Sequence, residues 1–241
     1  MKVLVVIPAY NEEKNILNVC KKLDKTKKEL NFILDYIVIN DGSSDSTEFV
    51  CKKNKIPMIN LSQNLGIGGA VQTGYKYAFK KDYDIVIQFD GDGQHNPDFI
   101  KELVEPIKNN VADMTIGSRY IGDLSEFKSS KLRQLGISLL SWILKLTTKQ
   151  KIFDVTSGFR AVNKSLIRLF SDDYPNDYPE PETIVAVLKK GYKVKEIPVK
   201  MHERVYGKSS ITPLKSIYYM MKVSYAMVIR SIIERGENNG K

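Results

Sequence analysis

Cysteine and long apolar runs are scarce in this 241-residue chain. Its two cysteines, Cys20 and Cys51, form no C-x-x-C pair and are too few for a disulfide framework, which fits a reducing compartment. No window contains the roughly 18 uninterrupted apolar residues of a transmembrane helix. The nearest, Ile217–Ile233, is interrupted by Lys222 and Arg230. The sequence therefore predicts a non-integral protein that can lie on the cytoplasmic face of a membrane.

The chain nevertheless has enough apolar content for a core, because 42% of its residues are hydrophobic. The N-terminal run MKVLVVIPAYNEE has too short an apolar stretch for a signal peptide and no small-residue cleavage site, so it predicts a buried strand. Length and content predict one domain, residues 1–211, followed by an amphipathic helix and a polar tail, residues 212–241. The net charge of +9 favours anionic partners, although solubility alone would also account for it.

Strand and helix patterns alternate along the first half of the chain. Apolar runs predict strands at Val3–Ile7, Tyr36–Ile39, Ile56–Asn60, Asp84–Phe89 and Met114–Gly117. Helical spacing predicts helices at Asn11–Leu23, Asp45–Lys53, Gly66–Lys80 and Pro97–Lys108. The second half predicts helices at Ser129–Lys145, Lys164–Phe170 and Pro213–Arg235, a helix ending at Lys190 and a strand at Tyr192–Val199. This order indicates an α/β fold with a mostly parallel central sheet flanked by helices, and with a C-terminal amphipathic helix.

Three aspartates, Asp41, Asp90 and Asp92, directly follow predicted strands. Ligands bind at the carboxyl ends of strands in open α/β sheets, so these carboxylates should share one edge. Clustered carboxylates repel one another unless a cation joins them, and the Asp-Gly-Asp spacing lets both side chains turn toward one ion. Oxygen ligands suit Mg²⁺ or Mn²⁺. A polar turn that caps the next helix is the alternative explanation of this stretch.

The three strand ends read PAYNEE, NDGSSD and FDGDGQHNP, at residues 8–13, 40–45 and 89–97. The segments NLGIGGA, GSRY, SGFR and KKGYKVKEIPVKMHERVYGKSSI follow at residues 64–70, 117–120, 157–160 and 189–211. This ordered set resembles the inverting nucleotide-sugar glycosyltransferases of family 2, which have the GT-A fold. It is most similar to the dolichol- or polyprenol-phosphate mannose synthase branch and to related bacterial cell-surface glycan transferases.

The resemblance implies a donor site on these strand ends. Pro8, Tyr10 and Glu12 would line the base and ribose of a UDP- or GDP-sugar, Asp41 would hydrogen-bond the base, and Asp90 would lie near the ribose. The alternatives are ordinary edge packing for Tyr10 and turn chemistry for Asp41. The glycines of LGIGGAVQTG, residues 65–74, predict close helix–sheet approach or backbone contact with the donor.

The resemblance also implies a metal cofactor. Asp90, Asp92 and Gln94 would hold Mn²⁺ or Mg²⁺ against the diphosphate, where the ion would stabilise the departing nucleoside diphosphate. His95 could ligate Mn²⁺, but a surface or capping role explains it equally, so it is left out of the metal set.

Arginine suits bidentate phosphate recognition, and the candidate cations are Arg119, Arg133, Arg160 and Arg204. By resemblance, Arg119 and Arg133 would bind the phosphate of the acceptor. Arg204, assisted by Lys208, would close over the donor diphosphate. The alternative for several of them is pairing with acidic side chains on the surface.

Glu180 and Glu182 lie where family members that act on sugars often place an acidic residue. The resemblance favours Glu182 as the residue that touches the transferred sugar or the acceptor. It would act as a general base toward a hydroxyl acceptor, or bind a sugar hydroxyl, because a phosphate acceptor is already anionic and needs no base. The predicted catalytic set is Asp92, Glu182, Arg119 and Arg204.

The function that these predictions favour is metal-dependent transfer of a sugar to a polyprenyl phosphate. Transfer to a sugar hydroxyl of a lipid-linked or cell-wall glycan is the alternative and shares the donor site. A sugar nucleotidyltransferase would need a Gly-rich basic loop where PAYNEE is acidic. Nucleic acid is not expected as a partner, because clustered aspartates repel its phosphates.

Two segments, Leu132–Leu146 and Pro213–Arg235, are predicted amphipathic helices with basic residues. Such helices can lie at an anionic membrane interface. Packing on the core, on a second protomer or on a membrane-protein partner is the alternative.

Overall fold

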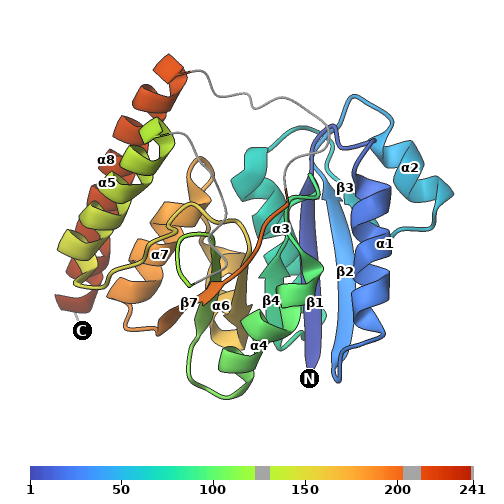
Figure 1. The fold of residues 1–241 in the computed structure, drawn as a ribbon, viewed down its shortest axis with the longest axis horizontal. Helices are drawn as coiled ribbons and strands as arrows, with labels where there is room; N and C mark the ends of the chain where they lie inside the picture. The colour runs from blue at the N-terminus through green and yellow to red at the C-terminus, as the bar shows by residue number, and fades with distance from the viewer. Residues whose placement is uncertain (123–130, 203–212, 240–241) are drawn as a thin grey trace.

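The fold is that of a computed structural model, which describes the backbone of residues 1–122, 131–202 and 213–239. Within these ranges seven strands form one sheet in the order β3-β2-β1-β4-β6-β5-β7 (Figure 1). The strands are β1 (Lys2–Ala9), β2 (Ile33–Asn40), β3 (Met58–Asn60), β4 (Ile85–Gln88), β5 (Met114–Ser118), β6 (Arg160–Asn163) and β7 (Val194–Pro198). β6 runs antiparallel to both of its neighbours, and the other pairs are parallel. The predicted α/β fold with a mostly parallel sheet is confirmed.

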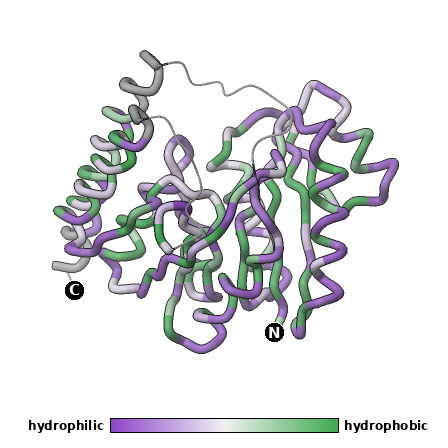
Figure 2. The backbone as a smooth tube through the Cα atoms, in the orientation of Figure 1, coloured by the Kyte–Doolittle hydropathy of each residue, from purple (hydrophilic) through white to green (hydrophobic). Residues whose placement is uncertain are grey.

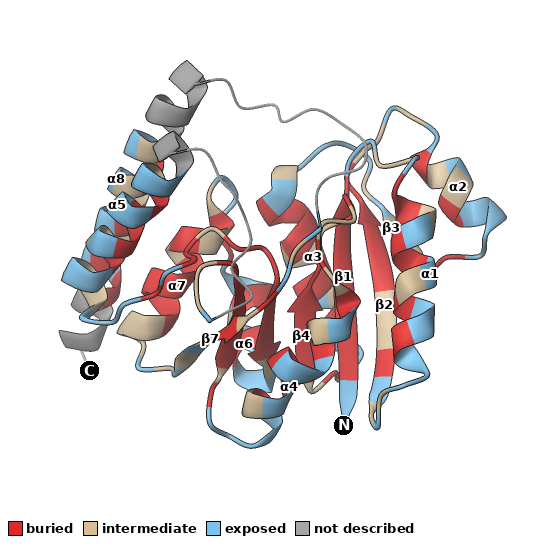
Figure 3. Cartoon of the chain, in the orientation of Figure 1, coloured by how far each residue is buried: buried red, intermediate tan, exposed pale blue. Residues whose placement is uncertain are grey.

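Helices cover both faces of the sheet. They are α1 (Ile16–Lys27), α2 (Thr47–Lys53), α3 (Gly66–Lys80), α4 (Ile100–Lys108), α5 (Lys131–Thr148), α6 (Lys164–Asp172), α7 (Pro179–Lys189) and α8 (Pro213–Asn239), with a 3-10 turn at Pro97–Phe99. Side chains alternate along β1, so Leu4 and Val6 pack in a core with α3, α6 and α7, whereas Val3 and Val5 pack in a second core with α1 and α4. Figure 3 shows the buried strands between these layers.

The boundaries of several elements differ from the prediction. α1 begins at Ile16 rather than Asn11, because Asn11 adopts a φ of +58° and a turn follows in which the Glu12 carbonyl accepts from the Asn15 N–H over 3.0 Å. β6 was not predicted as a strand. α8 ends at Asn239 rather than Arg235, and the predicted domain boundary between residues 211 and 212 lies outside the described ranges.

Glycines let α3 approach its neighbours closely, as predicted for the LGIGGAVQTG segment. A Cβ added at Gly74 would lie 2.2 Å from a methyl carbon of Val6, so α3 lies directly on β1. A Cβ at Gly68 would lie 2.2 Å from the Pro175 carbonyl oxygen. The start of α3 therefore contacts the segment before α7, which brings the two halves of the chain together beside the site.

α5 and α8 lie side by side at one edge of the molecule (Figure 1). Val223 and Met227 of α8 are buried. Arg230 of α8 donates to Asp173 over 2.5 Å, and Glu234 pairs with Lys190 over 2.6 Å, so the described part of α8 is fastened to the body of the fold. Among the described residues, no helix combines the length and apolarity that crossing a membrane requires.

Candidate active site

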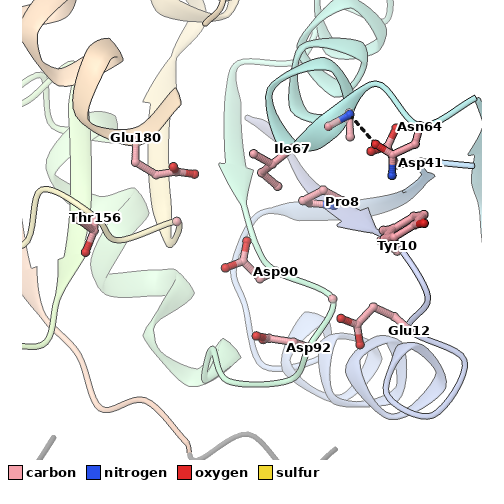
Figure 4. A pocket seen from close by; sticks show the side chains of 15 residues that line it. Pro8, Tyr10, Glu12, Asp41, Asn64, Ile67, Asp90, Asp92, Thr156 and Glu180 are labelled. Carbon is pink, nitrogen blue, oxygen red and sulfur yellow. Dashed lines mark hydrogen bonds between the residues drawn. The ribbon is translucent and has the colours of Figure 1, made fainter. Parts of the chain in front are cut away.

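A cleft of about 400 Å³ opens where the carboxyl ends of β1, β2 and β4 meet. β1 pairs with β2 on one side and with β4 on the other, so the loops that follow these strands diverge and leave a crevice. Asp41, Asp90 and Asp92 all line it (Figure 4). The structure therefore brings the three strand-end aspartates to one edge.

One wall of the cleft, here called the donor wall, consists of Pro8, Tyr10, Glu12 and Asp41. The Tyr10 side chain lines the cleft and is 50% exposed. Asp41 is buried, and its Oδ1 accepts from the Leu65 N–H over 2.7 Å. Asp41 therefore fixes the start of α3 and also lines the cleft, and its contact with a base stays a prediction.

The loops after β1 and β2 are fastened to each other. The Ser44 N–H donates to Asn11 Oδ1 over 2.9 Å, and the Asn11 N–H donates to Ser43 Oγ over 3.0 Å. The Glu12 N–H donates to Thr47 Oγ1 over 2.9 Å. The NDGSSD stretch therefore supports the PAYNEE loop, a role that sequence reasoning missed and that its density of Ser and Asp could have indicated.

The floor of the cleft holds Asp90 with a buried histidine beneath it. His95 Nε2 lies 3.0 Å from Asp90 Oδ2, and the His95 ring stacks on Phe159 with ring centroids 5.0 Å apart. His95 is therefore a buried partner of Asp90 and not a surface residue. Burial acts to raise the pKa of Asp90, but His95 and Arg160 outweigh it and hold that pKa below its usual value. Asp90 is thus ionised at neutral pH.

Asp90 and Asp92 supply two carboxylates to the cleft, which fits a divalent cation completed by a diphosphate. Among the described residues, no three His, Cys, Asp or Glu side chains form a cluster that could hold an ion alone. Gln94 does not line the cleft: its N–H donates to Asp92 Oδ1 over 3.0 Å, and its carbonyl accepts from the His202 N–H. Gln94 thus orients Asp92 through its backbone.

The opposite wall, here called the Glu180 wall, consists of Thr156, Gly158 and Glu180. Gln88 Nε2 donates to Glu180 Oε1 over 3.2 Å. Burial raises the pKa of Glu180, and Asp90 raises it further, while Arg160 opposes them. Asp90 and Glu180 line the same cleft, so the two carboxylates share one space. In Figure 4 they reach toward each other across the cleft.

Glu182, the predicted catalytic glutamate, is not among the residues that line the cleft. α7 begins at Pro179, so residues 180 and 182 both lie in its first turn and point about 200° apart around the helix. Burial raises the pKa of Glu182, and the charges that act on it are Arg230, Asp177 and Asp173. The residue at which α7 begins determines which of the two glutamates reaches the cleft. The YPEPET stretch alone does not identify that residue.

Of the phosphate ligands that the resemblance implies, only Arg119 has a described side chain. Arg119 is buried and clamped by Asp154, with Nε to Oδ2 at 2.8 Å and Nη2 to Oδ1 at 2.7 Å, and it also bonds Thr156 Oγ1 at 3.2 Å. Asp154 was not predicted as a partner. Arg204 and Lys208 lie outside the described residues, and of Arg133 only the backbone is described.

The family model described as "Glycosyl transferase family 2" matches residues 4–170. The chain belongs to this family. It is therefore a glycosyltransferase that uses a nucleoside-diphosphate sugar, and the resemblance drawn from the strand-end motifs is confirmed.

Two proteins similar to this glycosyltransferase have names that specify a dolichol phosphate. The UDP-N-acetylglucosamine–dolichyl-phosphate N-acetylglucosaminyltransferase of Methanococcus voltae is 31% identical, over 94% of this chain and 95% of that protein. The dolichol-phosphate mannosyltransferase of Pyrococcus furiosus is 31% identical, over 92% of this chain and 64% of that one. Glucosyl-3-phosphoglycerate synthase of Mycobacterium tuberculosis, solved with Mn²⁺ and UDP-glucose, superposes with a TM-score of 0.73 at 19% identity, over 95% of this chain and 79% of that one. The last likeness confirms the GT-A fold.

Proposed function

We propose that this glycosyltransferase moves a sugar from a nucleoside-diphosphate sugar to a polyprenyl phosphate at a membrane surface, with Mn²⁺ or Mg²⁺ as cofactor. The relatives from Methanococcus and Pyrococcus, whose names specify dolichyl phosphate, support this acceptor. The observation that carries it is an apolar face on α5 and α8, because an acceptor with a polyprenyl chain is presented at a bilayer.

The α5–α8 face has two exposed stripes with the same spacing. Its members are Leu135, Leu139, Trp142 and Leu146 on α5, and Met221, Tyr225, Val228 and Ile232 on α8. Figure 2 shows hydrophobic residues along both helices. Where the side chains of the two helices are described, their sole carboxylate, Glu234, is buried, whereas Lys145 and Lys222 are exposed. Apolar and aromatic side chains with lysines and without exposed acids complement an anionic bilayer.

The donor would lie across the cleft from the donor wall to the Glu180 wall. Tyr10 would pack on the base, and Asp41 and Glu12 would accept hydrogen bonds from the base and ribose. Asp90 and Asp92 would hold the cation, which when bound offsets the charge that develops on the departing diphosphate. The sugar would then lie between these carboxylates and Glu180.

In the transfer, an oxygen of the acceptor phosphate forms a bond to the anomeric carbon as the bond from that carbon to the diphosphate oxygen breaks. The nucleoside diphosphate leaves with the electron pair, and the configuration inverts. Glu180, not Glu182, is the carboxylate that we place on a sugar hydroxyl. Arg133, Arg204 and Lys208 stay as proposed phosphate ligands. Arg119 stays as well, because Asp154 holds its guanidinium beside Thr156, which lines the cleft.

One observation favours the alternative acceptor, a sugar hydroxyl. Burial raises the pKa of Glu180 above its ordinary value despite the opposing charge of Arg160, and a carboxylate with a raised pKa is a stronger general base. In that reaction Glu180 would take the proton of the attacking hydroxyl.

The test is a transfer assay with Mn²⁺ or Mg²⁺, a panel of labelled UDP- and GDP-sugars, and a short polyprenyl phosphate. Labelled lipid that requires metal and is lost in Asp92→Ala is the expected result and identifies the donor. Metal-dependent donor hydrolysis without labelled lipid would move the acceptor to a glycan hydroxyl. A wild-type protein that neither hydrolyses nor transfers any of the sugars would refute the proposal.

A further inference from the structure

Arg160 is a buried cation in the middle of the sheet. It lies on β6 opposite Gln88 of β4 in the antiparallel register, and the two side chains are 1% and 0% exposed. Directly opposed residues place their side chains on the same face of a sheet. A charge removed from water destabilises a fold unless polar groups surround it, so the partners of Arg160 should reveal its role.

The hydrogen bonds of Arg160 join two segments. Its Nε and Nη2 donate to the Ser157 carbonyl over 3.1 and 2.6 Å. Its Nη1 donates to the Glu180 carbonyl over 3.1 Å and to Thr183 Oγ1 over 2.9 Å. None of these acceptors is a carboxylate. The planar guanidinium therefore bridges the loop before β6 and the first turn of α7, as its fork of donors allows.

Both bridged segments carry residues of the Glu180 wall. Thr156 and Gly158 flank Ser157 and line the cleft, and so does the Glu180 side chain. A Cβ added at Gly158 would lie 3.0 Å from Asp90 Oδ2, so this loop is packed against the Asp90 carboxylate. Arg160 thus connects the backbone that touches Asp90 with the backbone that carries Glu180.

The Glu180 carboxylate is held from a second direction. Gln88 Nε2 donates to Glu180 Oε1 over 3.2 Å, and Gln88 Oε1 accepts from the Tyr174 hydroxyl over 3.3 Å. Gln88 and Tyr174 are both buried. The backbone of Glu180 is therefore fixed by Arg160, and its side chain by Gln88.

The charge of Arg160 also acts on the cleft. It lowers the pKa of both Asp90 and Glu180, although it forms no ion pair with either of these described residues. Since the guanidinium is enclosed and committed to backbone and hydroxyl acceptors, it is not placed to bind a phosphate.

We propose that Arg160 is a positioning residue that clamps the 156–158 loop to the first turn of α7 and so fixes Glu180 opposite Asp90. Sequence reasoning included Arg160 among candidate phosphate-binding cations, and this assignment replaces that reading. The kinetic consequence rests on the proposed function, whereas the structural consequence does not.

The kinetic test compares Arg160→Lys with Arg168→Lys, an exposed arginine on α6 that serves as the matched control. Lysine keeps the charge but cannot bridge both segments, and a displacement of about 1 Å at a reacting group lowers turnover by about 100-fold. We expect kcat of Arg160→Lys to fall on that scale, with the Kd of the nucleoside diphosphate unchanged. A parallel loss of nucleotide affinity would instead make Arg160 a diphosphate ligand and overturn the proposal.

A double-mutant cycle tests whether Arg160 acts through Glu180. In a Glu180→Gln background, Arg160→Lys should lower kcat only slightly further, because the side chain that it positions has already lost its function. Equal fold losses in both backgrounds would mean that the substitution disturbs the fold generally.

Hydrogen exchange supplies a test that does not depend on activity. Arg160→Lys should accelerate amide exchange in residues 156–160 and 179–189 and leave β1 and β2 unchanged. Uniform acceleration of exchange, or no acceleration, would overturn the clamp even if the wild type transfers sugar. Local acceleration in a protein that is inactive on every sugar would support the clamp and reject the proposed function. Thr183→Val removes one bond of the clamp and should give a weaker version of the same pattern if Arg160→Lys does not fold.

Discussion

The donor wall and the Glu180 wall face each other across one cleft, but their supporting contacts differ. Side chains and backbone groups of two surface loops support the donor wall, through bonds such as Asn11 to Ser43 and Ser44. The Glu180 wall rests on Arg160, Gln88 and buried neighbours of both. Tyr10, the exposed residue of the donor wall, can therefore be changed with little effect on the fold, whereas the residues that support the Glu180 wall are part of the core.

This difference assigns separate tasks to the two walls. The exposed Tyr10 ring and the carboxylates of the donor wall can recognise a nucleoside before the reaction begins, so changes there should alter affinity. The Glu180 wall is preorganised by buried contacts, and preorganised groups act mainly on the transition state. Changes there should alter turnover and stability.

The largest effect is expected at Asp92, on the floor between the walls. Asp92→Asn removes a carboxylate that we assign to the metal, so the charge on the departing diphosphate is stabilised less. Turnover should fall by about 10²–10³-fold, the scale for losing one group aimed at developing charge. Asp98→Asn, an exposed aspartate six residues later, is the control and should behave as wild type. A fully active Asp92→Asn enzyme would show that Asp92 is not a metal ligand required for transfer.

The second prediction concerns membrane binding by the α5–α8 face. Trp142 and Tyr225 are 58% and 70% exposed on the α5–α8 face, and a carboxylate at either position opposes insertion into an anionic bilayer. Trp142→Glu with Tyr225→Glu should weaken binding to phosphatidylglycerol vesicles by at least about tenfold, on the scale of one lost apolar side chain. Phe49→Glu, on an exposed aromatic of α2, is the matched control. Equal vesicle binding by the double variant and the control would mean that the α5–α8 face does not bind the membrane.

The two walls also differ in how far the sequence predicted them. Asp41, Asp90 and Asp92 follow strands of a parallel array, and parallel strands place their carboxyl ends together, so local pattern was enough. The Glu180 wall depends on β6, an antiparallel strand that begins with a buried arginine, and no periodicity identifies such a strand. Whether Glu180 reaches the cleft depends on where α7 starts. The position of His95 depends on which side chain packs against Asp90, and both are set by tertiary contacts.

The donor wall should respond in affinity alone. Tyr10→Ala removes an exposed ring, so the Kd of the nucleoside diphosphate should rise by about tenfold, within the range measured for one stacked base. Thermal stability and the rate at saturating donor should stay near wild type, since the ring covers little of the core. A calorimetric titration with UDP and GDP measures this. Unchanged affinity for both nucleotides would place the base elsewhere.

The smallest effect is expected in the stability of Glu180→Gln. Burial raises the folded-state pKa of Glu180 above its ordinary value of 4.5, so its protonated form is the one that the fold favours. Its contribution to stability is therefore complete below pH 4.5 and is lost as the pH rises through the folded-state pKa. Glutamine cannot ionise, and its amide oxygen can still accept from Gln88.

Glu180→Gln should accordingly melt above the wild type at neutral pH, and the scale for reading the difference is roughly 2–4 °C per kcal/mol for a chain of this size. The gain should disappear on acidification toward pH 4, while activity is reduced at every pH. Glu102→Gln, on exposed α4 surface, should show no such pH-dependent gain. A lower melting temperature for Glu180→Gln at neutral pH would mean that the ionised carboxylate stabilises its wall, and the contrast between the two walls would then rest on turnover alone. A higher one would mean that this wall holds a charge which the fold itself disfavours, as expected where a buried carboxylate is kept for catalysis.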